Sequence, residues 1–472
     1  MTMMLRNAGW PILLAVLGIA AVWAGWVGFM ASDDGLYYYA ALQWFTNPPA
    51  PGANHWATRF PVVLGFVGSI AMFGRSLLAF HLVSLFWYLA IVGVTAGLSW
   101  QLAGRRAGWI AAILAATLPV IATNASIVNC DLPEAVFLVG GLWLLIGGRQ
   151  TRSALFAGCS FGHAVLCRET AILALAGLAI PFLMRGAAMR RRLLLVGVGI
   201  VLVLGAEMLF QYWVTGNAFH RYGIAANHDS HINRPANLEG NFLVHPAIDP
   251  LLVLLVNDDF GLLFWIGGAV LLLKRLPTGA VRSGRDAFFL IGGMALASFV
   301  VISLLYTKLV LNPRYFSLAA IAMLLVVALW LSRQTNRTVL GVLALIVASN
   351  LLLLSATNRD PRWSSEALAT AARTYPRAVI AGDSDVVKRA EILLTIDGSP
   401  NVRIAPFASA PLRLVIGDVG PADQIVAVYH APPTRIGQVL DALDLSQVLP
   451  ERVRGRVMSP SGTAFLVRTK PS

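Results

Sequence analysis

The chain has 472 residues, of which 57% are hydrophobic and 12% are charged, and its mean hydropathy is +0.71. These values exclude an ordinary soluble globular protein. The formal net charge of +13 is compatible with nucleic-acid binding, but in a membrane protein basic residues more often record orientation. The composition therefore predicts a polytopic membrane protein without a nucleic-acid partner.

Apolar runs near the ~20 residues that cross a bilayer recur along the first three-quarters of the chain. Such runs must be helical, because lipid offers no hydrogen bonds to the backbone. Hydropathy predicts about eleven transmembrane helices, over residues 10–30, 77–102, 109–127, 135–147, 154–166, 170–184, 193–213, 251–273, 287–306, 315–331 and 339–356. We interpret residues 1–31 as an uncleaved anchor, because their apolar stretch exceeds that of a usual signal peptide. The predicted fold class is an all-α polytopic membrane protein.

The basic residues predict the orientation of these helices. With the N-terminus in the cytoplasm, most lysines and arginines of the first 356 residues fall in cytoplasmic loops, including the three arginines at 190–192. The positive-inside rule favours this arrangement. The first outer loop, residues 31–76, then contains an apolar segment, 60–73, that is too short to cross and is expected to lie along the membrane interface. The Ala-, Arg- and Gly-rich composition suggests a GC-rich bacterial source, and the expected location is the bacterial inner membrane.

Residues 357–472 are expected to form a small periplasmic α/β domain after a transmembrane domain of residues 1–356. Hydrophobicity falls in this part of the chain. The strand-like runs AVIAGD, LRLVIGD, QIVAVYH and GTAFLVR alternate with the helical patterns SSEALATAART, DVVKRAEILLTI and RIGQVLDALDL. This alternation is typical of an α/β fold.

Charged side chains collect at the predicted outer ends of the helices. A charge at membrane depth costs free energy unless it faces a cavity or a partner, so these residues are candidates for function. A carboxylate can take a proton from a nucleophile while neighbouring cations stabilise an anionic leaving group such as phosphate. The residues are Asp33, Asp34, Asn129, Asp131, Glu134, Arg168, Glu169, Glu207, Asp258, Asp259, Lys308, Arg314 and Tyr315.

Structural explanations compete with these functional ones. Asp33 and Asp34 are suited to cap the helix that begins at LYYYAALQW. Arg314 could anchor a helix end at the lipid headgroups, and Arg168 with Glu169 could form a structural pair. The three tyrosines at 37–39 suit an interfacial belt as well as a sugar-stacking surface. The four histidines between residues 215 and 250 are irregularly spaced, which favours a solvated loop over a zinc site.

Five segments resemble, in order, those of a known family. They are DDGLY, RRAGWIAAILAATLPVIATNASIVNCDLPEAVF, GCSFGHAVLCRETAILALAGLAIPFL, WVTGNAFHRYG and NPRYF. The first is similar to the Asp-Glu-x-x-Tyr element of the GT-C glycosyltransferases related to protein O-mannosyltransferases and lipid A aminoarabinose transferases, with Asp34 in place of glutamate. The resemblance covers most of residues 10–331.

The resemblance implies an inverting glycosyltransferase that moves a sugar from a polyprenyl-phosphate donor to a lipid, glycan or protein acceptor. It implies Asp33, Asp34 and Asp131 as catalytic carboxylates. The residues expected to bind the donor phosphate or the substrate are His55, Arg59, Arg168, Glu169, Arg221, Lys308, Arg314 and Tyr315. The family's Lys-Pro-Pro-Leu segment reads HWATRFPVVL here, so His55 or Arg59 would replace its lysine.

No cofactor is expected to be required, although a divalent cation bridging Asp33 and Asp131, as in the oligosaccharyltransferase branch of this fold, stays an alternative. Membrane lipids are expected partners. Three other functions stay open: a transporter or flippase for a lipid-linked sugar, an O-antigen polymerase or ligase, and a sensor or assembly factor. Against a transporter, the sequence has no paired halves with matching broken helices.

Overall fold

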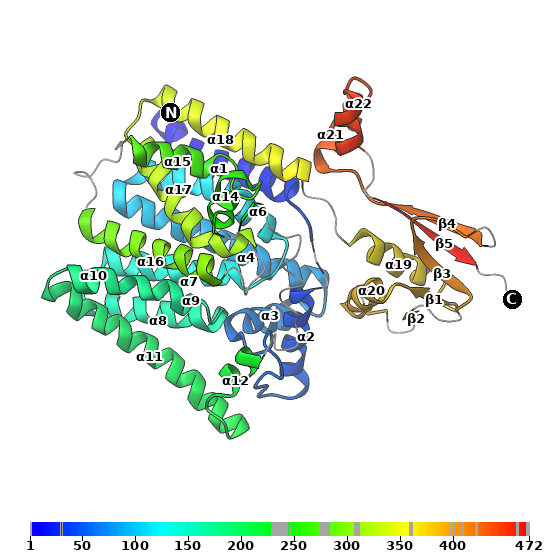
Figure 1. The fold of residues 1–472 in the computed structure, drawn as a ribbon, viewed down its shortest axis with the longest axis horizontal. Helices are drawn as coiled ribbons and strands as arrows, with labels where there is room; N and C mark the ends of the chain where they lie inside the picture. The colour runs from blue at the N-terminus through cyan, green and yellow to red at the C-terminus, as the bar shows by residue number, and fades with distance from the viewer. Residues whose placement is uncertain are drawn as a thin grey trace.

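The structure, a computed structural model, describes residues 2–28, 30, 32–148, 150–227, 244–245, 247–273, 284–305, 312–357, 362–396, 398–399, 403–406, 410–420, 423–458 and 462–468. Figure 1 shows a helical bundle and, beside one end of it, an α/β region. The amino terminus lies toward the opposite end of the bundle (Figure 1).

The bundle contains long helices and several short ones. Its elements are α1 (Thr2–Ala24), α2 (Asp33–Thr46), α3 (Phe60–Phe73), α4 (Leu77–Ala103), α5 (Arg105–Thr117), α6 (Pro119–Ala122), η1 (Thr123–Ala125), α7 (Asp131–Gly147), α8 (Thr151–Cys167), α9 (Ala171–Leu175), η2 (Ala176–Leu178), α10 (Ala179–Met184), α11 (Ala187–Thr215), α12 (His220–Asn227), α14 (Asp249–Val256), α15 (Leu263–Leu272), α16 (Gly284–Leu305), η3 (Pro313–Phe316), α17 (Ser317–Leu331) and α18 (Asn336–Thr357). The segment predicted to lie along the interface forms α3.

Within the described residues, five helices are long and apolar enough to cross a membrane, or six if one bent pair counts as a span. They are Leu77–Ala103, Ala187–Thr215, Gly284–Leu305, Pro313–Leu331 and Asn336–Ala356, with the bent pair at Arg105–Thr117 and Pro119–Ala125. The predicted span at residues 10–30 falls in α1 as far as Ala24, and the remaining predicted spans appear as shorter helices. The multi-pass character is therefore confirmed, whereas the number of about eleven crossings stays a prediction.

Two predicted spans are broken, and here the continuous helices expected from hydropathy were wrong. Residues 109–127 bend by 66° between α5 and α6, because Pro119 has no N–H and holds Leu118 in an extended conformation. Residues 251–273 divide into α14 and α15 around a polar turn that ends at Gly261, whose φ is +51°. Both breaks lie close to the candidate site described below.

The segment formed by α9, η2 and α10 packs closely against α16. A Cβ atom added at Gly177 of η2 would lie 2.2 Å from the carbonyl oxygen of Gly293. Small residues permit such close backbone approach between helices in a membrane.

The α/β region forms a five-stranded mixed sheet of order β2-β1-β3-β5-β4. Its elements are α19 (Trp363–Thr374), β1 (Val379–Gly382), α20 (Ser384–Ile396), β2 (Arg403–Pro406), β3 (Leu412–Ile416), β4 (Gln424–His430), α21 (Arg435–Ala442), α22 (Glu451–Val457) and β5 (Thr463–Arg468). The four predicted strands and three predicted helices are all present, whereas β2 and α22 were missed. The first three strands in this order are parallel, and β5 is antiparallel to β3 and β4.

The α/β region has an apolar core of its own, built around Leu368, Ile380 and Leu466, apart from the large core of the bundle. Its contacts with the bundle include the guanidinium of Arg362, which donates to the carbonyl of Val27 at 2.6 Å. The division of the chain into two domains near residue 357 stays a prediction.

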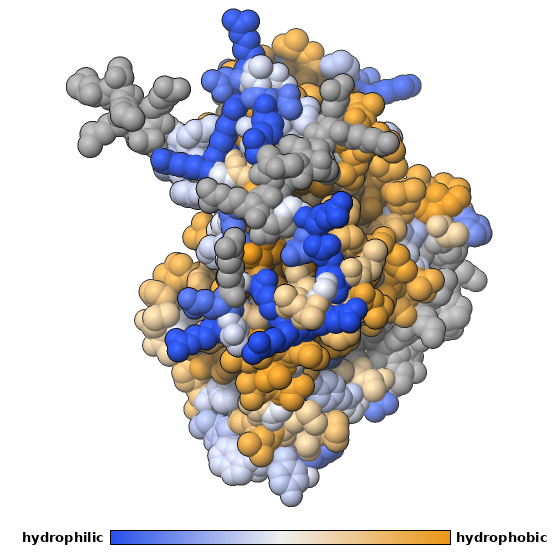
Figure 2. Space-filling view, turned by 90° about the vertical axis from the view of Figure 1, so that its left-hand side faces the viewer, coloured by the Kyte–Doolittle hydropathy of each residue, from blue (hydrophilic) through white to orange (hydrophobic). Residues whose placement is uncertain are grey.

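Basic side chains mark the end of the bundle that lies away from the α/β region. Figure 2 faces this end and shows hydrophilic residues gathered over it. Exposed residues at the helix ends in question include Arg105, Arg152, Arg190, Arg191, Arg333 and Arg337. We call this the basic end of the bundle.

Candidate functional site

Two adjacent carboxylates at the start of α2 have different surroundings. Asp34 is only 1% exposed, and its carboxylate accepts hydrogen bonds from the backbone N–H groups of Met30, Ser32 and Gly35 at 2.6 to 2.9 Å. Burial raises the pKa of Asp34 to about 6, although these hydrogen bonds and Arg362 lower it. The side chain of Asp33 is 37% exposed and lies 3.8 Å from the guanidinium of Arg314. Asp34 therefore fixes the backbone at the start of α2 through these hydrogen bonds, while the carboxylate of Asp33 remains accessible to a ligand.

The bend after α5 builds the next part of the site. The N–H of Val120 donates to the carbonyl of Asp259 at 3.0 Å, which joins this bend to the turn between α14 and α15. Asn124 and Asn129 then hydrogen-bond to each other through their side chains, and the Asn129 side chain accepts the N–H of Asp131 at 3.0 Å. This network places Asp131 at the first position of α7.

Asp131 lies between two arginines that come from distant parts of the chain. Its Oδ1 accepts from Arg168 at 2.6 Å, and its Oδ2 lies 3.4 Å from Nε of Arg314. Arg168 occupies the break between α8 and α9, and Arg314 lies in η3, where the side chain of Asn312 accepts its backbone N–H. Both guanidinium groups face the ring of Tyr315, at 4.1 and 5.7 Å from its centroid. Because Asp131 is 4% exposed, these pairs are largely removed from water.

Glu134, one turn into α7, belongs to the same group. Its carboxylate lies 3.8 Å from Arg168. Burial raises the pKa of Glu134 to about 8, in spite of the opposing effect of Arg168. Glu134 is therefore largely protonated at neutral pH.

A second charged group surrounds Arg59. Arg59 is 7% exposed, and it donates to the hydroxyl of Tyr37 at 2.5 Å and contacts His55 and the thiol of Cys130. Its guanidinium lies 3.9 Å from Glu169. Because Cys130 precedes Asp131 in the chain, this group lies next to the first one.

Arg221 of α12 completes the second group. It is fully buried and donates to the carboxylate of Glu169 at 2.8 Å and to the carbonyl of Val165 at 2.9 Å. Although burial opposes ionisation, Arg221 and Arg59 together hold the pKa of Glu169 below its ordinary value. Arg221 thus links α12 to the end of α8.

A cavity of about 210 Å³ adjoins the first group. Asp33, Asp34, Asp259 and Arg314 line it, together with the side chains of Asn124, Asn129 and Asn312. The cavity is therefore rich in carbonyl and carboxylate oxygens and has one guanidinium in its wall.

The structure brings together most of the residues that the sequence singled out. Asp33, Asp131, Arg168, Arg314 and Tyr315 form the first group, and His55, Arg59, Glu169 and Arg221 form the second. Lys308 lies outside the described residues. Asn124 and Asn312 of the cavity were missed, and polar residues interrupting apolar runs are the signal that points to them.

The tyrosines of α2 do not have the role that their sequence position suggested. Tyr37 and Tyr38 are 0% and 1% exposed and lie inside the bundle core. A belt at the membrane surface and a sugar-stacking surface both require exposed rings, so neither interpretation applies to these two residues.

The two carboxylates expected to bridge a divalent cation do not fit that role in this arrangement. Arg314 lies between Asp33 and Asp131, at 3.8 and 3.4 Å, where a bridging ion would be needed. Across the described ranges, no three His, Cys, Asp or Glu side chains are grouped so that they could hold a metal ion. The positive charge between the carboxylates is supplied by a guanidinium.

Comparison with known protein families found one match. Residues 53–213 match the family model of dolichyl-phosphate-mannose-protein mannosyltransferases. No curated protein matches the sequence.

Solved structures share the fold over almost the whole chain. ArnT from Cupriavidus metallidurans in the apo state matches with a TM-score of 0.59 and 13% identity over 99% of this chain and 100% of that one. The same protein bound to undecaprenyl phosphate gives 0.61 and 14%, over 98% and 99%. An oligosaccharyltransferase from Archaeoglobus fulgidus, in complex with Zn and sulfate, gives 0.50 and 16% over 83% of this chain and 61% of that one. The family model thus matches residues 53–213, and the solved structures share the fold of this chain.

Proposed function

We propose that the protein is an inverting glycosyltransferase that moves a sugar from a polyprenyl-phosphate donor to a hydroxyl or phosphate of a lipid, glycan or protein acceptor. The observation that carries this proposal is a cluster of four arginines beside an accessible carboxylate. Arg59, Arg168, Arg221 and Arg314 lie against the carboxylates of Asp33, Asp131 and Glu169.

A guanidinium in a site of low dielectric attracts an anion strongly. Arginine presents planar, paired N–H groups that match the oxygens of phosphate. Arg314 is the cation best placed to make such a contact, because it lines the cavity and is 32% exposed. A phosphate there would lie next to Asp33.

These positions support the following reaction. Asp33 takes the proton of the acceptor hydroxyl while the acceptor oxygen forms a bond to the anomeric carbon of the sugar. The bond between this carbon and the phosphate oxygen breaks, and its electron pair stays on the departing polyprenyl phosphate. Arg314, with Arg168 behind it, stabilises the charge that develops on the phosphate. Asp131 fixes both guanidinium groups.

The nature of the donor and the side of the membrane are part of the proposal. The fold is shared with a Cupriavidus ArnT structure that was determined bound to undecaprenyl phosphate, which supports a polyprenyl-phosphate donor. The basic end of the bundle lies opposite the α/β region (Figures 1 and 2). The positive-inside rule supports a cytoplasmic basic end, a cytoplasmic N-terminus and a site on the periplasmic face of a bacterial inner membrane.

The test is sugar transfer by the purified protein with a panel of polyprenyl-phosphate sugars. Asp33→Asn should lower the transfer rate by about 10²–10⁴-fold, because a general base contributes that much, while donor binding stays intact. Asp385→Asn is the matched control, since its side chain is 78% exposed in the α/β region and pairs only weakly with Lys388 at 3.9 Å. Transfer by Asp33→Asn at the rate of the control would remove Asp33 from the chemistry. Movement of the intact lipid-linked sugar across the bilayer, without transfer, would indicate a flippase instead.

A further inference from the structure

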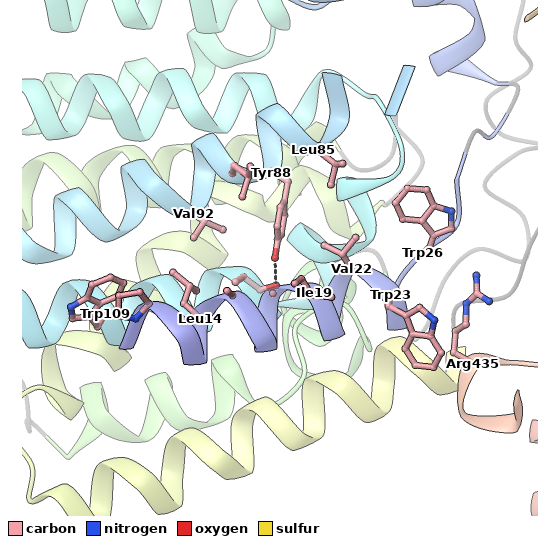
Figure 3. A pocket seen from close by; sticks show the side chains of 15 residues that line it. Leu14, Ile19, Val22, Trp23, Trp26, Leu85, Tyr88, Val92, Trp109 and Arg435 are labelled. Carbon is pink, nitrogen blue, oxygen red and sulfur yellow. Dashed lines mark hydrogen bonds between the residues drawn. The ribbon is translucent and has the colours of Figure 1, made fainter. Parts of the chain in front are cut away.

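An apolar groove of about 810 Å³ runs between α1 and the helices α4 and α5 (Figure 3). Leu14 and Val22 of α1 line it opposite Leu85 and Val92 of α4. The hydroxyl of Tyr88 also points into this region, but it donates to the carbonyl of Ala116 at 2.8 Å (Figure 3). Along most of its length, the groove therefore presents apolar surface and few hydrogen-bonding groups to a ligand.

The groove has the length of a chain in one leaflet of a bilayer. It extends along α1 from Pro11 to Trp23, which at 1.5 Å per residue is about 18 Å. One leaflet contributes about half of the ~30 Å hydrocarbon core. The neighbouring surface of α1 is apolar and open, with Ile12 63% and Ile19 71% exposed. A hydrocarbon chain can thus enter sideways from the membrane.

One end of the groove is built for a polar headgroup. Trp23, Trp26 and Arg435 lie together there, at the end next to the α/β region (Figure 3). Arg435 comes from α21, and its guanidinium lies 5.9 Å from the ring of Trp23. Tryptophan and arginine side chains are typical of the level at which lipid headgroups lie.

The charge of Arg435 has no ion-pair partner among the residues that the structure describes. Its guanidinium donates to the side chain of Gln438 at 3.0 Å, and no carboxylate in the described part of the chain forms an ion pair with it. An adjoining pocket of about 230 Å³ shares Trp26 and Arg435 with the groove and also holds Arg362 and Glu366. The carboxylate of Glu366 in this pocket forms its ion pair with Arg362, at 3.4 Å.

We propose that the groove binds an anionic phospholipid of the surrounding leaflet, with an acyl chain along α1 and the phosphate on Arg435. The lipid would contact both α1 and α21, and so link the α/β region to the bundle. A sugar donor is a poorer occupant, because the groove shares no lining residue with the cavity beside Asp33. The proposal does not rest on the proposed reaction.

The experiment counts the lipids that stay bound to the full-length protein. Protein from nanodiscs of phosphatidylglycerol or phosphatidylcholine is released into detergent and weighed by native mass spectrometry, without any sugar donor. Wild type should retain one more phosphatidylglycerol molecule than Arg435→Gln. The variant should bind this lipid roughly fivefold more weakly, because one arginine near the membrane surface contributes about that much to binding of an anionic lipid. Arg452→Gln, an exposed arginine of α22 that lines neither pocket, should retain as much as wild type.

A second variant tests the apolar part independently. A Cβ atom at Gly18 would lie 3.5 Å from the hydroxyl of Tyr88, an ordinary contact, so Gly18→Leu should fill the groove without displacing α1. It should lose the same phosphatidylglycerol. Equal retention by Arg435→Gln and wild type, or equal retention of phosphatidylcholine, would overturn the proposal. So would displacement of the lipid by added polyprenyl phosphate, since the groove would then be a donor site.

Discussion

The two hollows of the bundle differ in size and in chemistry. The cavity beside Asp33 is about 210 Å³ and polar, whereas the groove along α1 is about 810 Å³ and almost wholly apolar. Around the small cavity, charged side chains form ion pairs with one another. In the large groove, a single arginine lies at one end. In a membrane protein, a large apolar hollow is a place for lipid, and buried charges mark the chemistry, because only function or pairing compensates their cost.

The sharpest test of this difference removes an arginine from the charged group. Arg168→Gln leaves Asp131, which is 4% exposed, without its 2.6 Å partner. Breaking a buried pair in this way should lower the free energy of unfolding by about 3–5 kcal/mol. Thermal or denaturant unfolding of the purified variants in detergent measures the loss.

Arg185→Gln is the matched control for Arg168→Gln. Arg185 also pairs with an aspartate at 2.6 Å, but Arg185 and Asp286 are 28% and 43% exposed. Its loss should cost about 0–1 kcal/mol. Equal losses in the two variants would mean that burial does not distinguish the charged group.

A second prediction separates the two neighbouring carboxylates of α2. Asp34→Asn should lower stability by about 1–3 kcal/mol, because the amide nitrogen cannot accept the N–H groups that the carboxylate satisfies. Asp33→Asn should change stability by less than about 0.5 kcal/mol, since its side chain is 37% exposed. The same unfolding assay, run beside the transfer assay, compares them. A stable Asp34→Asn variant would show that the backbone around Met30 does not depend on these hydrogen bonds.

The third prediction concerns pH. The pKa of Glu134 is about 8 in the folded protein and near 4.5 when exposed. The folded state therefore binds the proton more tightly, so the contribution of Glu134 to stability is complete below pH 4.5 and is lost as the pH rises through 8. Relative to Glu134→Gln, wild type should become less stable over this range by about 1 kcal/mol or more.

Unfolding midpoints of both proteins, measured at several pH values between 5 and 9, check this prediction. The difference between the midpoints of wild type and Glu134→Gln isolates Glu134, because the other titratable groups are the same in both proteins. Parallel pH profiles would show that the pKa of Glu134 is not raised in the folded protein.

Much of the fold was predictable, because membrane helices and alternating strands leave local signals. The runs at Leu77–Ala103 and Ala187–Thr215 are long and apolar, and both form continuous helices. The runs QIVAVYH and GTAFLVR form β4 and β5. The breaks near Pro119 and Gly261 were missed, because hydropathy averages over about twenty residues and does not register a bend.

For the candidate site, the residue types were predictable but their partners were not. Asp131, Arg168 and Arg314 were singled out from the sequence, yet nothing local shows that one carboxylate lies between these two arginines. Asp33 and Asp34 look alike in the sequence, and only their environments assign one to the cavity and the other to the backbone.

The sequence by itself determined that this protein crosses a membrane, that its basic loops lie on one side, and that charged residues gather at the other ends of the helices. These properties depend on composition and short-range periodicity, which each segment carries alone. Only the tertiary structure decided which charges pair, which carboxylate stays accessible, and where an apolar groove opens with one arginine at its end. Those properties depend on helices far apart in the chain, whose approach is set by the packing of all of them together.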